Sequence, residues 1–202
     1  MDRRVNGSCA SLAGLEVAIE QGDAGLVDAA IGRILLIHAF ILVYGGIPLL
    51  YMGDEIGLLN DYNYVHHPEH SADSRWVQRP KMDWSFAESR HDKTSIPGRI
   101  YDNLRDMIFT RKQLFQLHAN ANTSAVYTYN EQVFALLRHS PRGQILALGN
   151  FSEGYQFVTS QRLQELGFGG ELYDHIEKRA VNSRYGITLE PFQAMWLEAV
   201  AH

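Results

Sequence analysis

The sequence predicts a chain of two parts, a layered α/β part followed by an all-β part. The first part is indicated by a long apolar helical pattern that ends at Gly45-Gly46 and is followed at once by the wholly apolar run Ile47–Met52. A strand with one face in water would alternate apolar and polar residues, so this run is typical of a strand covered on both faces. After Leu117, short β-type segments separated by turn-rich pieces indicate the second part.

The composition indicates a globular chain. Its 202 residues, 46% of them hydrophobic, support one or two domains with a real core, and a net charge of −5 gives no indication of nucleic-acid binding. Cys9 is the only cysteine, so no internal disulfide can form and a reducing, cytoplasmic setting is expected. The opening MDRRVNGSCASLAG lacks the apolar stretch of a secretory signal.

Two helices are predicted before the apolar run. Residues Ser8–Glu20 form the first, with Ser8 or Ser11 placed to cap it. Asp23 can cap a second, longer helix that reaches Tyr44, because apolar residues recur along it at helical spacing.

A long loop and a third helix follow. Ile56–Pro97 contains no good periodic segment and is rich in Asp, Asn, His, Ser and Trp; a loop this long is usually functional or disordered. Ser95 can cap the next helix and Pro97 fits its first turn. The apolar face of that helix is expected at Ile100, Leu104, Met107, Ile108 and Phe115.

The segments AVYTYN, QVFALLRH, QILALGNF, YQFVTS, GITLE and AMWLEA predict a small antiparallel sheet or sandwich that begins near Asn120. Aromatic residues are spread along these segments. At period two they are expected to form the sandwich core rather than a carbohydrate-binding platform. They are Tyr127, Tyr129, Phe134, Phe151, Phe157 and Trp196.

Two apparent motifs are set aside. Ala29–Met52 is long enough to cross a bilayer, but Arg33 and His38 interrupt it and the glycine pair with Pro48 breaks it, so no membrane span is predicted. His66–His70, HHPEH, matches a zinc pattern that works only on a helix. Its proline disfavours helix, so no metal site is predicted.

The segment GGIPLLYMGDEIGLLND, from Gly45 to Asp61, resembles the eighth barrel strand of the α-amylase superfamily, with its Gly-x-Pro…Gly-x-Glu signature. DRRVNGSCASLAGLE before it and SADSRWVQRP after it are similar to amylosucrases and their sucrose-hydrolase relatives. LALGNFSE and ITLEPFQAMWLE resemble strands of the β-sandwich that follows the barrel in that family. The resemblance covers essentially the whole chain.

This resemblance implies a more specific fold. Residues 1–119 would be the last βα part of a (β/α)8 barrel, with a long loop after its last strand, and residues 120–202 a C-terminal antiparallel β-sandwich. A complete barrel takes about 250 residues, and about 120 precede the sandwich here. The chain is therefore expected to be the carboxyl-terminal part of a larger enzyme.

The resemblance also implies an activity. The complete enzyme would cleave sucrose, hold a glucosyl-enzyme intermediate and pass glucose to an α-1,4-glucan or to water, without a cofactor. The family's catalytic carboxylates come from earlier barrel strands, so this chain by itself is expected to lack catalytic residues and to be inactive. Asp54 and Glu55 cannot replace them, because a retaining pair lies about 5–5.5 Å apart across one sugar and adjacent strand residues face opposite ways. We expect them to anchor the barrel rim.

Two arginines are the candidate substrate-binding residues. Arg75 in SADSRW could grip a carboxylate in a two-pronged bond, and the resemblance implies that it pairs with an Asp of an earlier loop and bounds the glucosyl subsite. The alternative is a surface arginine stacked on Trp76 or Trp84. Ala72 stands where amylosucrases typically carry a second Asp.

Arg4 matches the arginine of the amylosucrase stretch Gly-Asp-Cys-Arg-Val-Ser-Gly, which the resemblance places on the fructosyl side of sucrose. So close to the chain start, Arg4 is expected to be frayed here.

Two other function classes compete with this interpretation. One is a non-catalytic β-sandwich module that binds a partner or a glucan, and the other is a membrane-associated protein held by Ala29–Met52. In the enzyme interpretation, the partners are sucrose and α-glucan. Self-association is also expected, because an uncovered apolar strand at Ile47–Met52 is an aggregation site.

Overall fold

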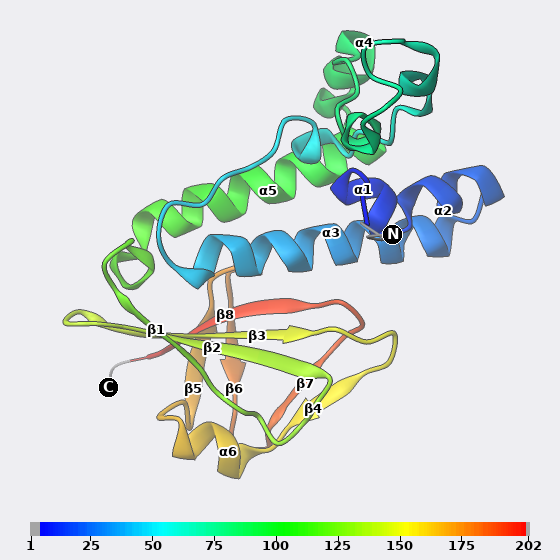
Figure 1. Ribbon diagram of the computed structural model, residues 1–202. Coiled ribbons are helices and arrows are strands. Elements are labelled where there is room, and N and C mark those ends of the chain that lie inside the picture. The colour runs from blue at the N-terminus through cyan, green and yellow to red at the C-terminus, as the bar shows by residue number, and fades with distance from the viewer. Residues whose placement is uncertain (1–4, 201–202) are drawn as a thin grey trace. The chain divides into compact units, whose positions relative to one another are not determined.

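The computed structural model describes residues 5–200 and divides into two compact units. One unit contains the described residues up to Ile34 together with Leu50–Leu104, and the other contains Leu35–Leu49 together with the residues from Arg105 onward. Two of the three divisions fall inside long helices, α3 (Ala24–Tyr44) and α5 (Ile96–Gln113), which are visible in Figure 1, and the third falls between Leu49 and Leu50.

The first predicted helix is broken into two. Helix α1 spans Cys9–Leu12 and α2 spans Leu15–Gln21, and Gly14 between them has a φ of 90°. Such a left-handed residue cannot continue a right-handed helix, so the prediction of one continuous helix is wrong. The predicted cap is confirmed, because the Ser8 side chain accepts a hydrogen bond from the backbone of α1.

The ends of α3 and the start of α5 are as predicted. Oδ1 of Asp23 accepts hydrogen bonds from the first backbone N–H groups of α3 at 2.8 and 3.1 Å. Gly45 and Gly46 follow Tyr44 with φ of 126° and 65°, where L side chains are strained. Ser95 Oγ accepts from the N–H of Gly98 at 3.0 Å and caps α5.

Helix α3 is long and apolar enough to cross a membrane by length and composition alone. Half of its apolar window is buried inside the protein. Arg33 lies on this helix and its Nη1 donates to the carbonyl of Ala13 at 2.9 Å.

The long loop contains short helical turns rather than extended periodic structure. These are η1 (Asp54–Ile56), η2 (Tyr62–His66), η3 (Ser74–Gln78), α4 (Trp84–Glu88) and η4 (Ser89–His91). A small core of Ile56, Leu58 and Ala87 holds them, with Met82 and Phe86 packed against it.

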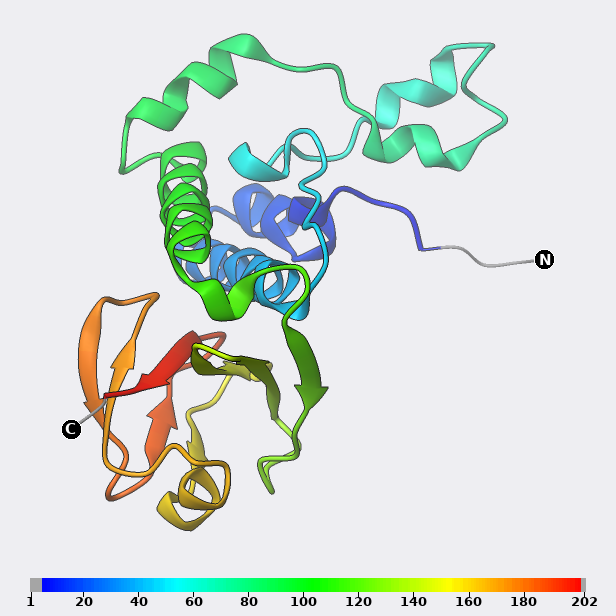
Figure 2. The same cartoon turned by 90° about the vertical axis from the view of Figure 1, so that its left-hand side faces the viewer.

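The apolar run Ile47–Met52 is not a strand. It pairs with no strand in the part of the chain that the structure describes, and Figures 1 and 2 draw it as irregular chain after α3. Ile47 is 91% exposed and Leu49 is 83% exposed. The prediction of a strand covered on both faces is therefore wrong for this chain, because a strand requires neighbours that supply its ladder hydrogen bonds.

The carboxyl-terminal part is an antiparallel β domain, as predicted (Figure 1). One sheet has six strands in the order β1-β2-β3-β8-β5-β6, and a second sheet pairs β4 with β7. The strands are β1 (Asn122–Ala125), β2 (Val133–Ser140), β3 (Gly143–Asn150), β4 (Gln156–Val158), β5 (Glu171–Asp174), β6 (Arg179–Asn182), β7 (Ile187–Leu189) and β8 (Ala194–Ala199), with η5 (Phe115–Leu117) before them and α6 (Ser160–Glu165) after β4. Residues of both sheets and of α6 share one apolar core.

Three details of the β domain differ from the predictions. The first strand ends at Ala125, so AVYTYN is mostly a loop, and β5 and β6 were not expected. Of the six aromatic residues expected in the core, only Trp196 is buried, at 1% exposure. The other five are between 43% and 64% exposed, so their assignment to the core is wrong: Tyr127, Tyr129, Phe134, Phe151 and Phe157. Period two identifies a shared face, but not whether that face is covered.

Candidate functional site

The loop that follows Gly57 carries the predicted site and is fastened to the amino-terminal helices. Gly57 has a φ of 70°, and a Cβ there would lie 2.7 Å from Cδ1 of Ile100, so only glycine fits. Oδ1 of Asn60 accepts a hydrogen bond from the backbone N–H of Ser8 at 2.8 Å. The backbone N–H of Asn60 donates to Ser11 Oγ at 3.0 Å. These contacts give the loop a defined starting point.

Asp61 brings the two ends of this loop together. Its Oδ1 accepts from the N–H of Asn63 at 2.9 Å and caps η2, and its own N–H donates to the carbonyl of Val77 in η3 at 2.8 Å. The segment containing Arg75 is thereby folded back beside the beginning of the loop.

Arg75 makes the two-pronged contact that its residue type predicted, and its partner is Asp73. Nε of Arg75 lies 2.8 Å from Oδ1 and 2.9 Å from Oδ2 of Asp73, and Nη2 lies 2.7 Å from Oδ2. The N–H of Arg75 also donates to Oδ1 at 3.0 Å, so Asp73 caps η3. The hydrogen bonds from Arg75 lower the pKa of the Asp73 carboxyl to about 2, which keeps it ionised.

This pairing differs in one respect from the resemblance, which implied an Asp from an earlier loop. Asp73 lies two residues before Arg75 on the same loop, and the side chains are 34% and 55% exposed. The alternative of stacking on Trp76 or Trp84 is found instead for Arg79, whose guanidinium carbon lies 5.1 Å from the centre of the Trp76 ring.

His70 completes the surroundings of Trp76. The two rings stack with centroids 3.6 Å apart and an angle of 19° between their planes. The HHPEH segment is only partly in η2 and continues as a turn, so its histidines do not share the face of a helix. Trp76 is thus held from two sides, next to the Asp73–Arg75 pair in the sequence.

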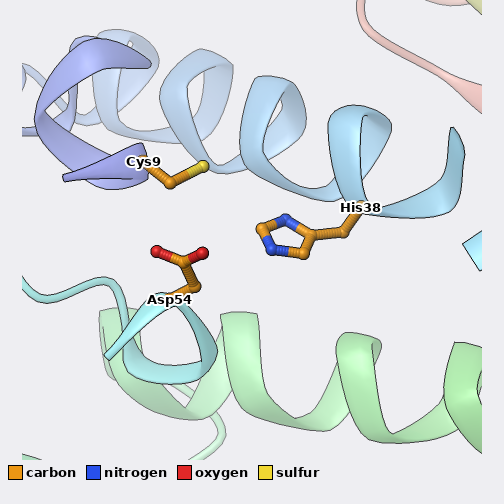
Figure 3. Close-up of side chains that lie close together, drawn as sticks. All are labelled: Cys9, His38 and Asp54. Atoms are coloured by element: carbon orange, nitrogen blue, oxygen red, sulfur yellow. The ribbon is translucent and has the colours of Figure 1, made fainter. Parts of the chain in front are cut away.

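Asp54 and Glu55 occupy η1, where they act locally. Oε2 of Glu55 accepts from the N–H of Gly53 at 2.8 Å, closing the turn that ends the apolar run. Figure 3 shows the Asp54 carboxylate directed toward Cys9, and it also draws His38 of α3. Burial, followed by the Asp54 charge, raises the pKa of Cys9 to about 11, so the thiol stays protonated and is a poor nucleophile.

The Asp73–Arg75 pair can bind polar groups but does not supply an activated nucleophile. An exposed guanidinium and an ionised carboxylate can donate to and accept from the hydroxyls of a sugar.

Arg4, the other predicted binding residue, lies outside the described residues. Sequence reasoning missed Asp73 as the partner, although an Asp directly before a short helical turn is a recognisable cap signal.

Comparison with known proteins finds a family model that matches most of the β domain. Residues 123–198 match the family model described as Amylosucrase, C-terminal domain. A curated relative, glucosylglycerate phosphorylase of Escherichia coli (strain K12), is 27% identical over 168 residues, which is 82% of this chain and 28% of the relative. The chain thus spans little more than a quarter of that protein.

Solved structures share the fold. A variant of AmyP in complex with maltotriose has a TM-score of 0.64 and 16% identity, covering 84% of this chain and 35% of that one. The α-amylase of Geobacillus thermoleovorans, complexed with acarbose, has a TM-score of 0.58 and 20% identity, covering 86% and 35%. The predicted fold class is confirmed by these neighbours together with the antiparallel β domain. The match of residues 123–198 to the amylosucrase C-terminal domain model agrees with the predicted resemblance to amylosucrases.

Proposed function

We propose that this chain is the carboxyl-terminal part of an amylosucrase-like retaining enzyme that transfers glucose from sucrose to an α-1,4-glucan or to water. The observation that supports it most is the occurrence, in one chain, of an amylosucrase C-terminal-like domain and the SADSRW loop with its two-pronged Asp73–Arg75 pair. In this proposal the catalytic carboxylates lie on earlier barrel strands of the complete protein.

The role of the described loop is to bound the sugar pocket. The Asp73–Arg75 pair is exposed and charged, so its hydrogen-bonding groups are available to the glucosyl unit. The anchoring of the loop through Asn60 and Asp61 keeps the pair in place. Arg4 would contact the fructosyl side in the complete enzyme.

A second candidate activity is phosphorolysis of a glucoside. The 27% identity to glucosylglycerate phosphorylase extends over 82% of the chain, well beyond the β domain. In that case inorganic phosphate accepts the glucosyl unit, and glucose 1-phosphate is released in place of a longer glucan or free glucose. The non-catalytic binding module remains the alternative if no longer protein exists.

The chain also has a surface suited to self-association. Ile47, Leu49 and Phe134 line an open apolar pocket of about 430 Å³ in the second unit. We propose that two copies cover this surface when the chain is isolated, because exposed apolar area of this kind drives association.

The test uses the reading frame upstream of Met1. A longer protein that includes it is incubated with sucrose, with sucrose and phosphate, and with glucosylglycerate and phosphate, and fructose, glucose, glucan and glucose 1-phosphate are measured. Fructose and glucan from sucrose alone support the proposal, whereas glucose 1-phosphate formed only from glucosylglycerate supports the phosphorylase. The 202-residue chain serves as a control that should release nothing, and sucrose turnover by it would contradict the assignment of the catalytic groups to another part of the protein.

A further inference from the structure

Two exposed tyrosines form a corner on the β domain. Tyr127 and Tyr129, on the connection between β1 and β2, are 55% and 64% exposed. Their ring centroids lie 5.5 Å apart, and the ring planes make an angle of 82°. We call these two residues and Arg162 of α6 the tyrosine corner; the connection lies beside α6 in Figure 1.

The corner is rigidly supported. The Arg162 guanidinium lies 4.7 Å from the centre of the Tyr129 ring, its Nε donates to the carbonyl of Tyr127 at 2.7 Å, and Nη1 pairs with Glu165 at 2.9 Å. The Arg162 side chain is only 16% exposed. Between the tyrosines, the buried Thr128 hydroxyl bonds to the carbonyl of Val133 at 3.1 Å. The rings are therefore oriented before any ligand arrives.

Tyr129 is strained and gains little burial in return. Its φ of 64° is left-handed, which is unfavourable for a bulky side chain and favours glycine or asparagine. A strained residue usually persists because packing compensates for it, but this ring remains mostly exposed. Strained residues cluster at active sites, ligand clamps and switch regions.

We propose that the tyrosine corner binds an α-glucan chain. The positive charge of Arg162 is paired with the carboxylate of Glu165. The corner therefore presents aromatic faces and hydroxyl groups, and such a surface suits a neutral ligand. The C–H faces of sugar rings pack on aromatic rings, and the tyrosine hydroxyls donate to and accept from sugar hydroxyls. The choice of α-glucan among neutral oligosaccharides rests on the proposed function. The binding itself requires no catalytic group.

The test measures binding by the 202-residue chain, not turnover. Native electrophoresis in gels with and without amylose should show retardation of the wild-type chain, and calorimetric titration with maltoheptaose should give a measurable Kd. Tyr129→Gly removes the ring and relieves the strained φ, so the Tm should stay equal or rise while the Kd increases at least tenfold. A variant that is merely damaged in folding would show a lower Tm as well as weaker binding. Tyr185→Ala, which removes another tyrosine that is 84% exposed, is the matched control and should bind like wild type.

Three outcomes would overturn the proposal. They are equal mobility of the wild-type chain with and without amylose, equal losses in Tyr129→Gly and Tyr185→Ala, or a change in self-association rather than in glucan binding. The result is separable from that for the proposed function, because a chain that binds amylose can belong to a longer protein that does not cleave sucrose, and the reverse also holds.

Discussion

The guanidinium of Arg138 donates from Nη1 to the backbone carbonyl of Tyr44 at 3.1 Å, joining the β domain to the last turn of α3 within the second unit. Arg138 is completely buried. Its Nη2 reaches the carbonyl of His118 at 2.6 Å, Nε reaches that of Gln116 at 3.3 Å, and Thr123 Oγ1 is a further partner. A buried charge surrounded by neutral acceptors depends on all of them, because each lost bond leaves a desolvated group.

This arrangement makes Gly45 sensitive to substitution. A Cβ at Gly45, whose φ is 126°, would lie 2.6 Å from Nη1 of Arg138 and 3.0 Å from Thr123 Oγ1. Gly45→Ala should therefore displace the guanidinium and lower the free energy of unfolding by about 3 kcal/mol. Gly46→Ala, with a φ of 65° and open space around its Cβ, should cost about 1 kcal/mol from backbone strain alone. Urea unfolding of the two variants tests this. Equal losses in the free energy of unfolding would show that the Arg138 guanidinium can move aside at little cost.

Asp174 should make stability depend on pH. Its Oδ1 accepts from the N–H groups of Ile176 and Trp196 at 3.0 and 3.1 Å, while the buried Oδ2 has no hydrogen-bond partner among the described residues. Burial raises the pKa of this carboxyl to about 6, with the nearby Glu177 charge acting in the same direction and Arg179 opposing it. Between about pH 4 and pH 6 the folded chain thus retains a proton that the unfolded chain releases.

The contribution of Asp174 to the free energy of unfolding is accordingly largest below about pH 4 and falls by up to about 3 kcal/mol as the pH rises to about 6. Asp174→Asn should remove this slope and make the chain more stable than wild type at pH 7. Urea titrations at pH 4.5 and 7.0 measure it, with Glu171→Gln on the exposed side of the same strand as control. Identical pH profiles for wild type and Asp174→Asn would refute the assignment.

Arg75 should matter for sucrose cleavage and little for folding. In the longer protein, Arg75→Ala should reduce the cleavage rate about a hundredfold, because small displacements of a bound sugar are costly. Arg75→Lys should not restore it, since an ammonium cannot reproduce the two-pronged contact with Asp73. The pair is exposed, so the unfolding midpoint should change little.

The control for this prediction is Arg79→Ala, which removes the guanidinium over Trp76 and should have a mild effect on the rate. Both variants are compared by fructose release from sucrose. Equal and harmless effects would identify Arg75 as a surface residue without a role in the sugar pocket.

The isolated chain should self-associate. Ile47 and Leu49 are 91% and 83% exposed, and they adjoin Phe134 in the apolar pocket of the second unit. Sedimentation velocity over a wide concentration range should show oligomers for the wild-type chain, and Ile47→Asp should shift it toward monomer. Val17→Asp, at another exposed apolar residue, is the control and should leave the distribution unchanged. A wild-type monomer at every concentration would contradict the prediction.

The sequence by itself determined the features whose causes lie within a few residues. Ser8, Asp23 and Ser95 cap helices because their side chains reach backbone N–H groups two to three residues ahead. The glycine pair after Tyr44 ends α3 because only glycine adopts those φ values without strain. Most of the β segments were likewise predicted from short alternating patterns.

Only the tertiary structure decided what those elements contact. Ile47–Met52 has the composition of a buried strand, yet it remains unpaired because a ladder requires neighbouring strands. The resemblance implied an Asp of an earlier loop as the partner of Arg75, but in the described chain its partner is Asp73, two residues before it. Tyr129 and Trp196 share an aromatic character, and whether each is covered depends on packing from distant parts of the chain. Burial and pairing are non-local, so they cannot be derived from local residue patterns alone.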